Sequence, residues 1–365
     1  MSELSELFIK TSTGGYRVKV GGGLVIEDSL AEHSVWIVDR NVLQLYSESI
    51  PVGSIVLNAL ESEKSLKTVA YLLEKLRDHN VTRETRVVAL GGGITQDLVT
   101  FAASCYMRGL RWTYFPTTML SMVDSCIGGK SSINVGRFKN LAGNIYPPDE
   151  VIVNAAFCET LSRIQLVEGL CEAAKICYAR SDEAFQSFLS LAKGIPMEDS
   201  VKRLAHLINF CLSTKRHFIE ADEFDQGVRQ LLNFGHTFGH AIESVTDYQI
   251  SHGVAVGLGI LAAKRFSVQA GFVSDELPNI NQLRRYIVEV LKGVPGLAKS
   301  LTELDPEDAF QRFLSDKKHT ESEYTLIVFN SIGRLQRVKL PRSSRVDETL
   351  VDAFRFLTGA LNEIQ

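Results

Sequence analysis

Short apolar runs separated by glycine or polar breaks dominate the first 155 residues of the chain. Such runs occur at 7–9, 16–20, 35–39, 55–57, 86–90, 112–116 and 151–153. Their length and their flanking breaks are typical of β-strands. Between them, 66–77 has the apolar spacing of an amphipathic helix, and 98–107 is also helical in pattern. The N-terminal region is therefore predicted to alternate strands with helices.

The pattern changes after the strand at 151–153. From about residue 161 to 283 the apolar positions indicate successive helices, and only 324–329 resembles a further strand. We therefore predict two domains, 1–155 and 156–365. A chain of 365 residues is long enough to give each domain a buried core.

The stretch 229–240 reads Arg-Gln-Leu-Leu-Asn-Phe-Gly-His-Thr-Phe-Gly-His. If it is helical throughout, as its apolar positions suggest, His236 and His240 lie one turn apart on the same face. Paired imidazoles indicate zinc or cobalt, and His252 or a distant carboxylate could complete the ligand set. The alternative is two unrelated histidines, one packed in the core and one capping a turn.

A carboxylate and an ammonium lie three residues apart in the predicted helix around 168–176. For Glu172 and Lys175 the ordinary interpretation is a surface ion pair. Their neighbours are apolar, however, and charged groups that become buried need partners. Glu172 is therefore the candidate for the third metal ligand.

The strand at 86–90 runs into Gly91, Gly92 and Gly93 and then into a helix. Backbone N–H groups at such a turn can bind a pyrophosphate, which favours a dinucleotide site. The turn lacks the G-x-G-x-x-G spacing, so an ordinary tight turn is the alternative. Asp39 ends a buried strand, where its carboxylate could bind a ribose or only cap the next helix.

Two lysines and an amide surround glycines in the region 124–140. Lys130, Lys139 and Asn140 could cradle a phosphate there, although the spacing is not that of a P-loop. Lys215 and Arg229 flank an acidic stretch, and Lys317 and Lys318 follow Asp316. On their own these last four cations are ordinary solvated charges.

Composition excludes several classes of function. The chain has 39 basic and 43 acidic residues and a net charge of −4, so no cationic field for nucleic acid or an anionic membrane is expected. No secretory pattern or membrane-length apolar run occurs, which predicts a cytoplasmic protein. The six cysteines lack C-x-x-C spacing and are expected to be reduced.

Nine motifs occur in a fixed order along the chain. They are GGG-x-x-x-D at 91–97, Y-M-R-G at 106–109, P-T-T at 116–118, D-S-x-x-G-G-K at 124–130, K-N at 139–140, E-x-x-K at 172–175, R-x-x-L-N-x-G-H-x-x-G-H at 229–240, H-G at 252–253 and D-K-K at 316–318. Together they resemble the 3-dehydroquinate synthase family, the founding branch of the sugar phosphate cyclases, over nearly the whole chain.

The resemblance implies an N-terminal Rossmann-like α/β domain that binds NAD and a C-terminal all-α domain that binds zinc or cobalt. Catalysis would take place in the cleft between them, and the protein would be a homodimer. The implied metal ligands are Glu172, His236 and His252. His240 would contact substrate instead, which replaces the expectation from spacing that it is a ligand.

The resemblance also assigns residues to NAD and to the sugar phosphate. The NAD set comprises Asp39, Glu61, Lys64, Gly91, Gly92, Gly93, Asp97, Thr117, Thr118, Asp124, Lys130, Lys139, Phe157 and Thr160. The substrate and catalytic set comprises Asp124, Lys130, Asn140, Lys175, Lys215, Arg229, Asn233, His240 and Lys318, with Lys317 as the neighbouring alternative, and Arg108 donated by the neighbouring subunit.

The implied reaction converts 3-deoxy-arabino-heptulosonate 7-phosphate to 3-dehydroquinate and phosphate, a step of the shikimate pathway toward aromatic amino acids. In the family NAD oxidises a secondary alcohol transiently, phosphate leaves by β-elimination, the ketone is reduced again, and an aldol step closes the ring. An arginine fork at Arg229 suits the substrate carboxylate.

Three positions depart from the family pattern. Gln96 stands where glycine is usual, 131–133 is Ser-Ser-Ile after the lysine, and Phe138 replaces a glycine before K-N. A specialised cyclase that uses an amino analogue or sedoheptulose 7-phosphate therefore stays an alternative, with a role in a secondary pathway. A metal- and NAD-dependent polyol dehydrogenase is a second alternative, and a non-catalytic binding protein of the same fold is a third.

Overall fold

The computed structural model describes residues 5–23, 33–136, 138–195, 200–316 and 318–360. By their internal contacts these divide into two compact units, Met1–Leu161 with Met197–Phe224, and Ser162–Pro196 with Asp225–Gln365. We call them the first and the second unit. The domain boundary at residue 155 stays a prediction. The two units divide at residue 161, and the segment Met197–Phe224 belongs to the first unit although it lies later in the sequence.

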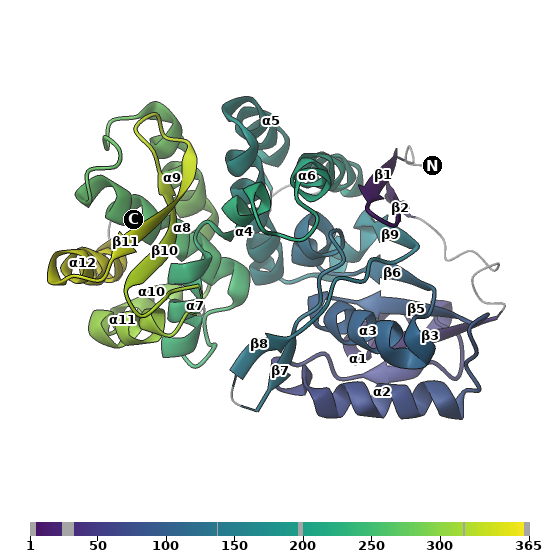
Figure 1. Cartoon of the computed structure of the whole chain (residues 1–365). Helices are drawn as coiled ribbons and strands as arrows, with labels where there is room; N and C mark the ends of the chain where they lie inside the picture. The colour runs from purple at the N-terminus through teal and green to yellow at the C-terminus, as the bar shows by residue number, and fades with distance from the viewer. Residues whose placement is uncertain (1–4, 24–32, 137, 196–199, 317, 361–365) are drawn as a thin grey trace. The chain divides into compact units, whose positions relative to one another are not determined.

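The first unit is built on a seven-stranded sheet in the order β1-β2-β9-β6-β5-β3-β4 (Figure 1). All neighbouring pairs from β2 to β4 are parallel, and β1 joins β2 antiparallel. The strands of this sheet are β1 (Ser5–Thr11), β2 (Gly14–Gly21), β3 (Ser34–Asp39), β4 (Ile55–Leu57), β5 (Arg86–Gly91), β6 (Trp112–Pro116) and β9 (Glu150–Asn154). Strands β7 (Ile133–Val135) and β8 (Phe138–Ala142) form a separate hairpin that the sequence analysis did not anticipate.

The central strands are continuous apolar runs because helices and loops cover both faces of the sheet. In β5, every residue from Val87 to Gly91 is buried. Helix α2 follows the predicted amphipathic pattern: Ser65 caps its N-terminus by accepting from Thr68 N at 3.3 Å, and it buries Val69, Leu72 and Leu76.

The helices of the first unit connect the strands or cover the sheet. They are α1 (Arg40–Leu45), α2 (Leu66–Asp78), α3 (Gly93–Cys105) and α6 (Val201–Ala221), with short helical turns η2 (Ser47–Ser49), η3 (Glu61–Glu63), η4 (Tyr106–Arg108), η5 (Ser121–Ser125) and η6 (Ala155–Thr160). Although α6 lies in the helical part of the sequence, it packs against β1, β2 and η6 and so belongs to the first unit.

The second unit is a helical assembly that also contains one hairpin. Its helices are α4 (Arg163–Arg180), α5 (Asp182–Ala192), α7 (His236–Val245), α8 (His252–Gln269), α9 (Pro278–Leu291), α10 (Leu297–Thr302), α11 (Pro306–Leu314) and α12 (Ser344–Ala360), with the turn η7 (Val228–Asn233). Strands β10 (Glu323–Phe329) and β11 (Leu335–Pro341) pair antiparallel. The sequence predicted the first of these strands only.

Helix α8 lies at the centre of the second unit and packs against α4, α7, α9 and α12. Every residue from Gly253 to Ala263 is buried, as expected for a helix enclosed by other helices. No helix among the described residues is both long enough and apolar enough to cross a membrane.

Candidate metal centre and cofactor-binding residues

Glycines bring α4 and α8 into close contact next to Glu172. A Cβ on Gly253 would lie 2.4 Å from Glu168 Cα and 2.5 Å from Glu168 O, so the first turn of α8 rests directly on the α4 backbone. Glu168 is one helical turn before Glu172, and His252 immediately precedes Gly253. The close approach therefore places the His252 side chain beside the Glu172 carboxylate.

The predicted single helix over 229–240 is wrong. The segment is a short 3₁₀ turn, η7, followed by Phe234 and by Gly235 in the left-handed conformation, with φ 78°, and α7 begins only at His236. An L-residue with a side chain is strained at that φ, which is why the chain breaks at this glycine. A Cβ on Gly259 of α8 would lie 2.0 Å from Gly235 O, so α7 and α8 are also in backbone contact.

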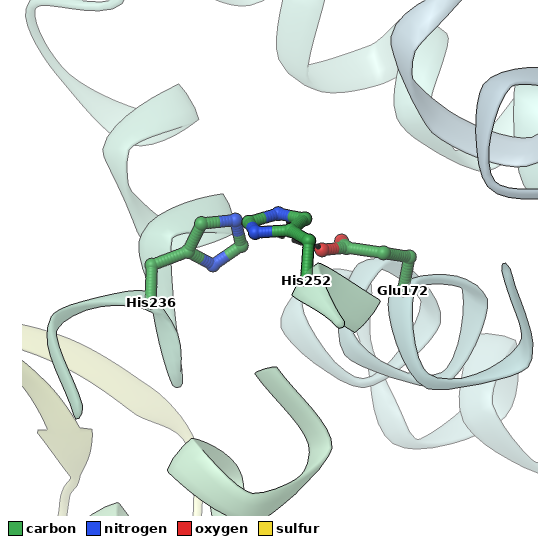
Figure 2. A group of neighbouring side chains, drawn as sticks. All are labelled: Glu172, His236 and His252. Atoms are coloured by element: carbon green, nitrogen blue, oxygen red, sulfur yellow. Dashed lines mark ion pairs between the residues drawn. The ribbon is translucent and has the colours of Figure 1, made fainter. Parts of the chain in front are cut away.

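Three potential metal ligands converge from α4, α7 and α8 (Figure 2). Glu172 Oε1 lies 3.6 Å from His236 Nε2 and 3.5 Å from His252 Nε2. The donor atoms of the three residues all lie within 4.8 Å of one another. Around a tetrahedral zinc ion with ligand bonds of about 2.0–2.2 Å, neighbouring donor atoms are about 3.3–3.6 Å apart. The spacing therefore fits a zinc-sized ion.

The carboxylate of Glu172 also has an unsatisfied oxygen. Glu172 is fully buried, and its Oε1 makes no hydrogen bond, while Oε2 accepts from Lys175 Nζ. A buried carboxylate oxygen without a partner is costly, and a cation between it and the two imidazoles would satisfy it. The donor set and its geometry thus fit a divalent metal.

Charges at this cluster favour a cation. Burial alone raises the pKa of Glu172, but Lys175 and His252 outweigh it and lower that pKa to about 2. Burial, with the Lys175 charge, holds the pKa of His236 well below its usual value, which favours a neutral imidazole with one lone pair. Burial likewise opposes charge on His252, but Glu172 and Glu243 outweigh it and raise its pKa to about 10. These carboxylates attract positive charge to the imidazole they flank.

His240 lies beside the cluster but faces another acid. Its ring centroid is 5.5 Å from that of His236, as one helical turn requires, and its Nδ1 lies 3.7 Å from Asp316 Oδ2. Burial lowers the pKa of His240 and the bond to Asp316 opposes that shift. Lys318 Nζ lies 3.1 Å from the same Asp316 oxygen. Asp316, which was not among the predicted site residues, thus joins two of them, while Lys317 lies outside the described residues.

A pocket of about 210 Å³ in the second unit is lined by amide, hydroxyl and cationic side chains. It is lined in part by Asn233, Thr237 and Lys318, together with Gln230 and Arg337. Arg229 is also in η7 and is 3% exposed. The predicted substrate residues Asn233 and Lys318 therefore share one concave surface.

In the first unit, five predicted residues form one polar cluster. Lys64 Nζ lies 3.2 Å from Asp97 Oδ2, 2.8 Å from Asn140 Oδ1 and 3.8 Å from Glu61 Oε1, and Lys139 Nζ lies 3.4 Å from Glu61 Oε1. Burial raises the pKa of Asp97 to about 6 although Lys64 opposes the shift. Residues from three segments of the sequence are brought together here.

The glycine turn lies at the C-terminal edge of the parallel sheet, between β5 and α3. Gly91 ends β5 and accepts from Thr117 N at 3.0 Å, and a Cβ on Gly92 would lie 3.0 Å from Thr118 Cγ2. The neighbouring strand β3 ends in Asp39, whose carboxylate accepts from Asn41 N at 2.7 Å and caps α1. Strand order reverses between β3 and β5, which is where open α/β sheets bind ligands.

Further predicted residues border this edge. Lys215 of α6 is buried and binds Asp124: its Nζ lies 2.6 Å from Oδ1 and donates to the backbone carbonyls of Asp124 and Ile127. Phe157 packs edge-on against Tyr46 at 5.1 Å, and Thr160 Oγ1 lies 3.2 Å from the Tyr46 hydroxyl. Lys215 thus lies in the first unit, whereas Arg229, with which it flanked the acidic stretch, lies in the second.

Lys130 and Arg108 are exposed, as is Thr160. Lys130 follows Gly129 at a bridge to Ile145, and Arg108 ends the turn η4. Met107 and Arg108 both have positive φ, 49° and 68°, an unusual backbone for residues with side chains. Gln96, one of the departures noted above, is 3% exposed and exchanges two hydrogen bonds with Ser125, each 2.7 Å.

The sequence analysis also missed Glu243. Its Oε2 lies 3.2 Å from His252 Nδ1, on the opposite side of the ring from Glu172. The signal was present in the spacing, because Glu243 is seven residues after His236 and so lies on the same face of α7.

Comparisons with known proteins cover almost the whole chain. Residues 54–168 match the family described as 3-dehydroquinate synthase N-terminal, and residues 169–319 match 3-dehydroquinate synthase C-terminal. The 3-dehydroquinate synthase of Alkaliphilus metalliredigens (strain QYMF) is 30% identical over 352 residues, which cover 92% of this chain and 96% of the relative. That of Natranaerobius thermophilus is 34% identical over 312 residues, covering 84% and 82%.

Solved structures share the fold at low identity. A 2-deoxy-scyllo-inosose synthase complexed with carbaglucose-6-phosphate, NAD+ and Co2+ has a TM-score of 0.80 at 22% identity, covering 96% of this chain and 99% of that one. The 2-epi-5-epi-valiolone synthase of Streptomyces hygroscopicus subsp. jinggangensis 5008, with NAD+ and Zn2+ bound, has 0.78 at 22%, covering 94% and 97%. Glycerol dehydrogenase of Schizosaccharomyces pombe has 0.54 at 14%, covering 91% and 84%. Two synthases and a dehydrogenase thus share the fold of this chain.

Proposed function

Because the chain belongs to the 3-dehydroquinate synthase family, we propose that it converts 3-deoxy-arabino-heptulosonate 7-phosphate to 3-dehydroquinate and phosphate. The observation that carries the proposal is the cluster of Glu172, His236 and His252 in a chain of this family, with donor atoms at the spacing of a metal centre. The fold does not separate a cyclase from a dehydrogenase, whereas the family match covers both halves of the sequence.

Two groups would supply the redox and acid chemistry. When bound, a divalent metal supplies Lewis acidity to the substrate hydroxyl, and NAD accepts a hydride and returns it within each turnover. Glu172, His236 and His252 would hold the metal. Lys175, buried against Glu172, keeps that ligand ionised and fixed in position.

The NAD site we propose is the C-terminal edge of the sheet in the first unit. The N-terminus of α3, which begins at Gly93 directly after Gly91 and Gly92, offers backbone N–H groups to a pyrophosphate. Asp39 would bind a ribose hydroxyl as well as cap α1. The residues proposed to line the rest of this site are Glu61, Lys64, Asp97, Thr117, Thr118, Asp124, Lys130, Lys139, Phe157 and Thr160.

Substrate groups would be held by cationic and amide side chains. Arg229 suits the substrate carboxylate because its guanidinium can donate two parallel hydrogen bonds. Asp316 orients the His240 ring through Nδ1, which leaves the other ring nitrogen for proton transfer. We assign phosphate and hydroxyl contacts to Lys130, Asn140, Lys215, Asn233 and Lys318.

The proposed setting is a cytoplasmic homodimer. Arg108 is exposed at the end of η4, on a backbone of positive φ, and in the proposal it reaches the active site of the neighbouring subunit. Its replacement by alanine should lower activity without changing metal content.

The test is a turnover assay of the purified chain with NAD and zinc or cobalt. The heptulosonate phosphate and sedoheptulose 7-phosphate are supplied separately, and phosphate, cyclic product and net NADH are measured. Phosphate and 3-dehydroquinate from the heptulosonate, with no net NADH, are expected. Removal of metal with a chelator should abolish both products, and added zinc or cobalt should restore them.

Two outcomes would contradict the proposal in different ways. Turnover of sedoheptulose 7-phosphate alone would make the protein a specialised cyclase. Accumulation of NADH without phosphate release would make it a dehydrogenase, in keeping with the fold that it shares with glycerol dehydrogenase.

A further inference from the structure

One face of α7 carries a third polar side chain besides the two histidines. His236, His240 and Glu243 are separated by four and three residues, so their side chains lie along one side of the helix. Glu243 is largely buried, with 12% of its side chain exposed. A carboxylate held in such surroundings needs a donor, and the His252 ring of α8 provides one.

The two nitrogens of His252 face two different carboxylates. Nε2 lies 3.5 Å from Glu172 Oε1, and Nδ1 lies 3.2 Å from Glu243 Oε2. A neutral imidazole has one N–H donor and one lone pair. If Nδ1–H donates to Glu243, the lone pair is on Nε2, which points toward the metal-ligand cluster.

The Nδ1 atom of His236 also faces a hydrogen-bond acceptor, but this acceptor is uncharged. This nitrogen lies 3.3 Å from the backbone carbonyl of Phe234, a neutral acceptor in the loop before α7. Both proposed ligand imidazoles therefore have an acceptor behind them, but only that of His252 is a carboxylate. A carboxylate both fixes the ring and makes the opposite nitrogen a better electron donor.

We propose that Glu243 is a positioning residue of the metal centre, which accepts the Nδ1–H of His252 and thereby orients Nε2 as a ligand. This inference rests on the proposed metal centre. Glu243 is not itself a ligand in this arrangement, because the His252 ring lies between its carboxylate and the cluster.

A second interpretation of the same residues makes a different prediction. One donor atom each of His240, Glu243 and His252 also lie within 4.8 Å of one another, so Glu243 could instead ligate an ion directly. The ring of His252 would then serve two ions. Metal stoichiometry separates the two arrangements: the positioning role requires one ion per chain.

The experiment measures metal binding to the full chain. Apoprotein is titrated with cobalt and zinc against a chromophoric chelator for wild type, Glu243→Gln and Glu243→Ala. We expect one ion per chain throughout, with affinity reduced about 10–100-fold in Glu243→Ala and less in Glu243→Gln, which keeps an oxygen acceptor but loses the charge. Nitrogen NMR of the zinc form should show a protonated Nδ1 on His252 in wild type.

Glu289→Gln is the matched control, because it makes the same chemical change at an exposed position of α9 in the same unit. It should bind metal like wild type. Circular dichroism shows whether each variant is folded.

Three results would overturn the inference while leaving the proposed function intact. They are wild-type affinity in Glu243→Ala, two ions per wild-type chain of which one is lost in Glu243→Ala, or an unprotonated Nδ1. Failure of the proposed metal centre looks different, because the wild-type chain itself would then bind no stoichiometric metal. Failure of the proposed reaction would appear in the turnover assay and would leave this titration unchanged.

Discussion

Replacement of Lys175 by methionine tests how much the buried ion pair of Lys175 with Glu172 contributes to the stability of the second unit. Lys175 and Glu172 are 1% and 0% exposed, and the ammonium donates to Glu172 Oε2. Methionine keeps most of the side-chain volume but leaves the carboxylate buried without this partner. Breaking a buried ion pair in this way costs about 3–5 kcal/mol. We expect the metal-free variant to lose that much stability at pH 7.

Metal should reduce the loss. In the proposed metal centre the ion would bind Glu172 and supply positive charge, and in the variant it would no longer be repelled by the ammonium. The variant should therefore bind metal more tightly even though it is inactive. A tenfold gain in affinity would restore about 1.4 kcal/mol at saturating metal.

The loss should also depend on pH. The pKa of Glu172 is lowered to about 2, with Lys175 as the largest of the lowering influences. A lowered carboxyl pKa contributes stability that is present above the unfolded pKa, near 4.5, and is lost as pH falls toward 2. Without Lys175 that contribution disappears, so the difference between wild type and variant should shrink below about pH 4.5.

Hydrogen exchange of peptides from α4, α7 and α8 is the appropriate assay, because it reports the second unit by itself. Peptides from α2 and α3 serve as the internal reference. Lys299→Met is the matched control: its Nζ lies 3.8 Å from Glu303 in an exposed pair, where a loss of less than about 0.5 kcal/mol is expected. Equal effects of the two variants, or an effect of Lys175→Met that metal leaves unchanged, would refute the reasoning.

Three other substitutions test neighbouring parts of the two units. Gly253→Ala should destabilise the second unit by more than about 2 kcal/mol and weaken metal binding, because the added Cβ would lie 2.4 Å from the α4 backbone. Gly359→Ala is the control, since a Cβ there would meet no other atom within 4 Å. Equal metal affinity in the two variants would contradict the close contact of α4 and α8. Burial raises the pKa of Asp97 to about 6, so ionisation of this carboxyl destabilises the fold as pH rises from 4 through 6. The free energy of unfolding of wild type, relative to that of Asp97→Asn, should therefore fall by roughly 2–3 kcal/mol over this pH range. A difference between the two proteins that does not change with pH would contradict this. Gln96→Gly removes both hydrogen bonds to Ser125 and should lower the stability of the first unit by about 2–4 kcal/mol. The fluorescence of the two tryptophans reports this unfolding, because both lie in the first unit. A change under about 0.5 kcal/mol would show that the two hydrogen bonds are dispensable.

Local patterns in the sequence were sufficient for much of the fold. The strand at 86–90 and the helix at 66–77 follow from apolar spacing, and both are present as β5 and α2. The alternation of strands with helices, followed by helices alone, predicted the fold class, and the ordered motifs predicted the family. The individual strands and helices depend on neighbours within about four residues along the chain, because the local pattern determines the directions of their side chains.

Only the tertiary structure decided how distant segments meet. The helix predicted over 229–240 is broken because Gly235 turns the chain and its carbonyl lies against Gly259 of α8, a contact that no local period encodes. The return of α6 to the first unit and the pairing of Glu243 with His252 are of the same kind. Glu172 comes within 3.5 Å of His252, 80 residues further along the chain, because Gly253 lets two helix backbones touch. Spacing along a sequence determines the face on which a side chain lies, but the packing of one backbone on another determines what that face meets.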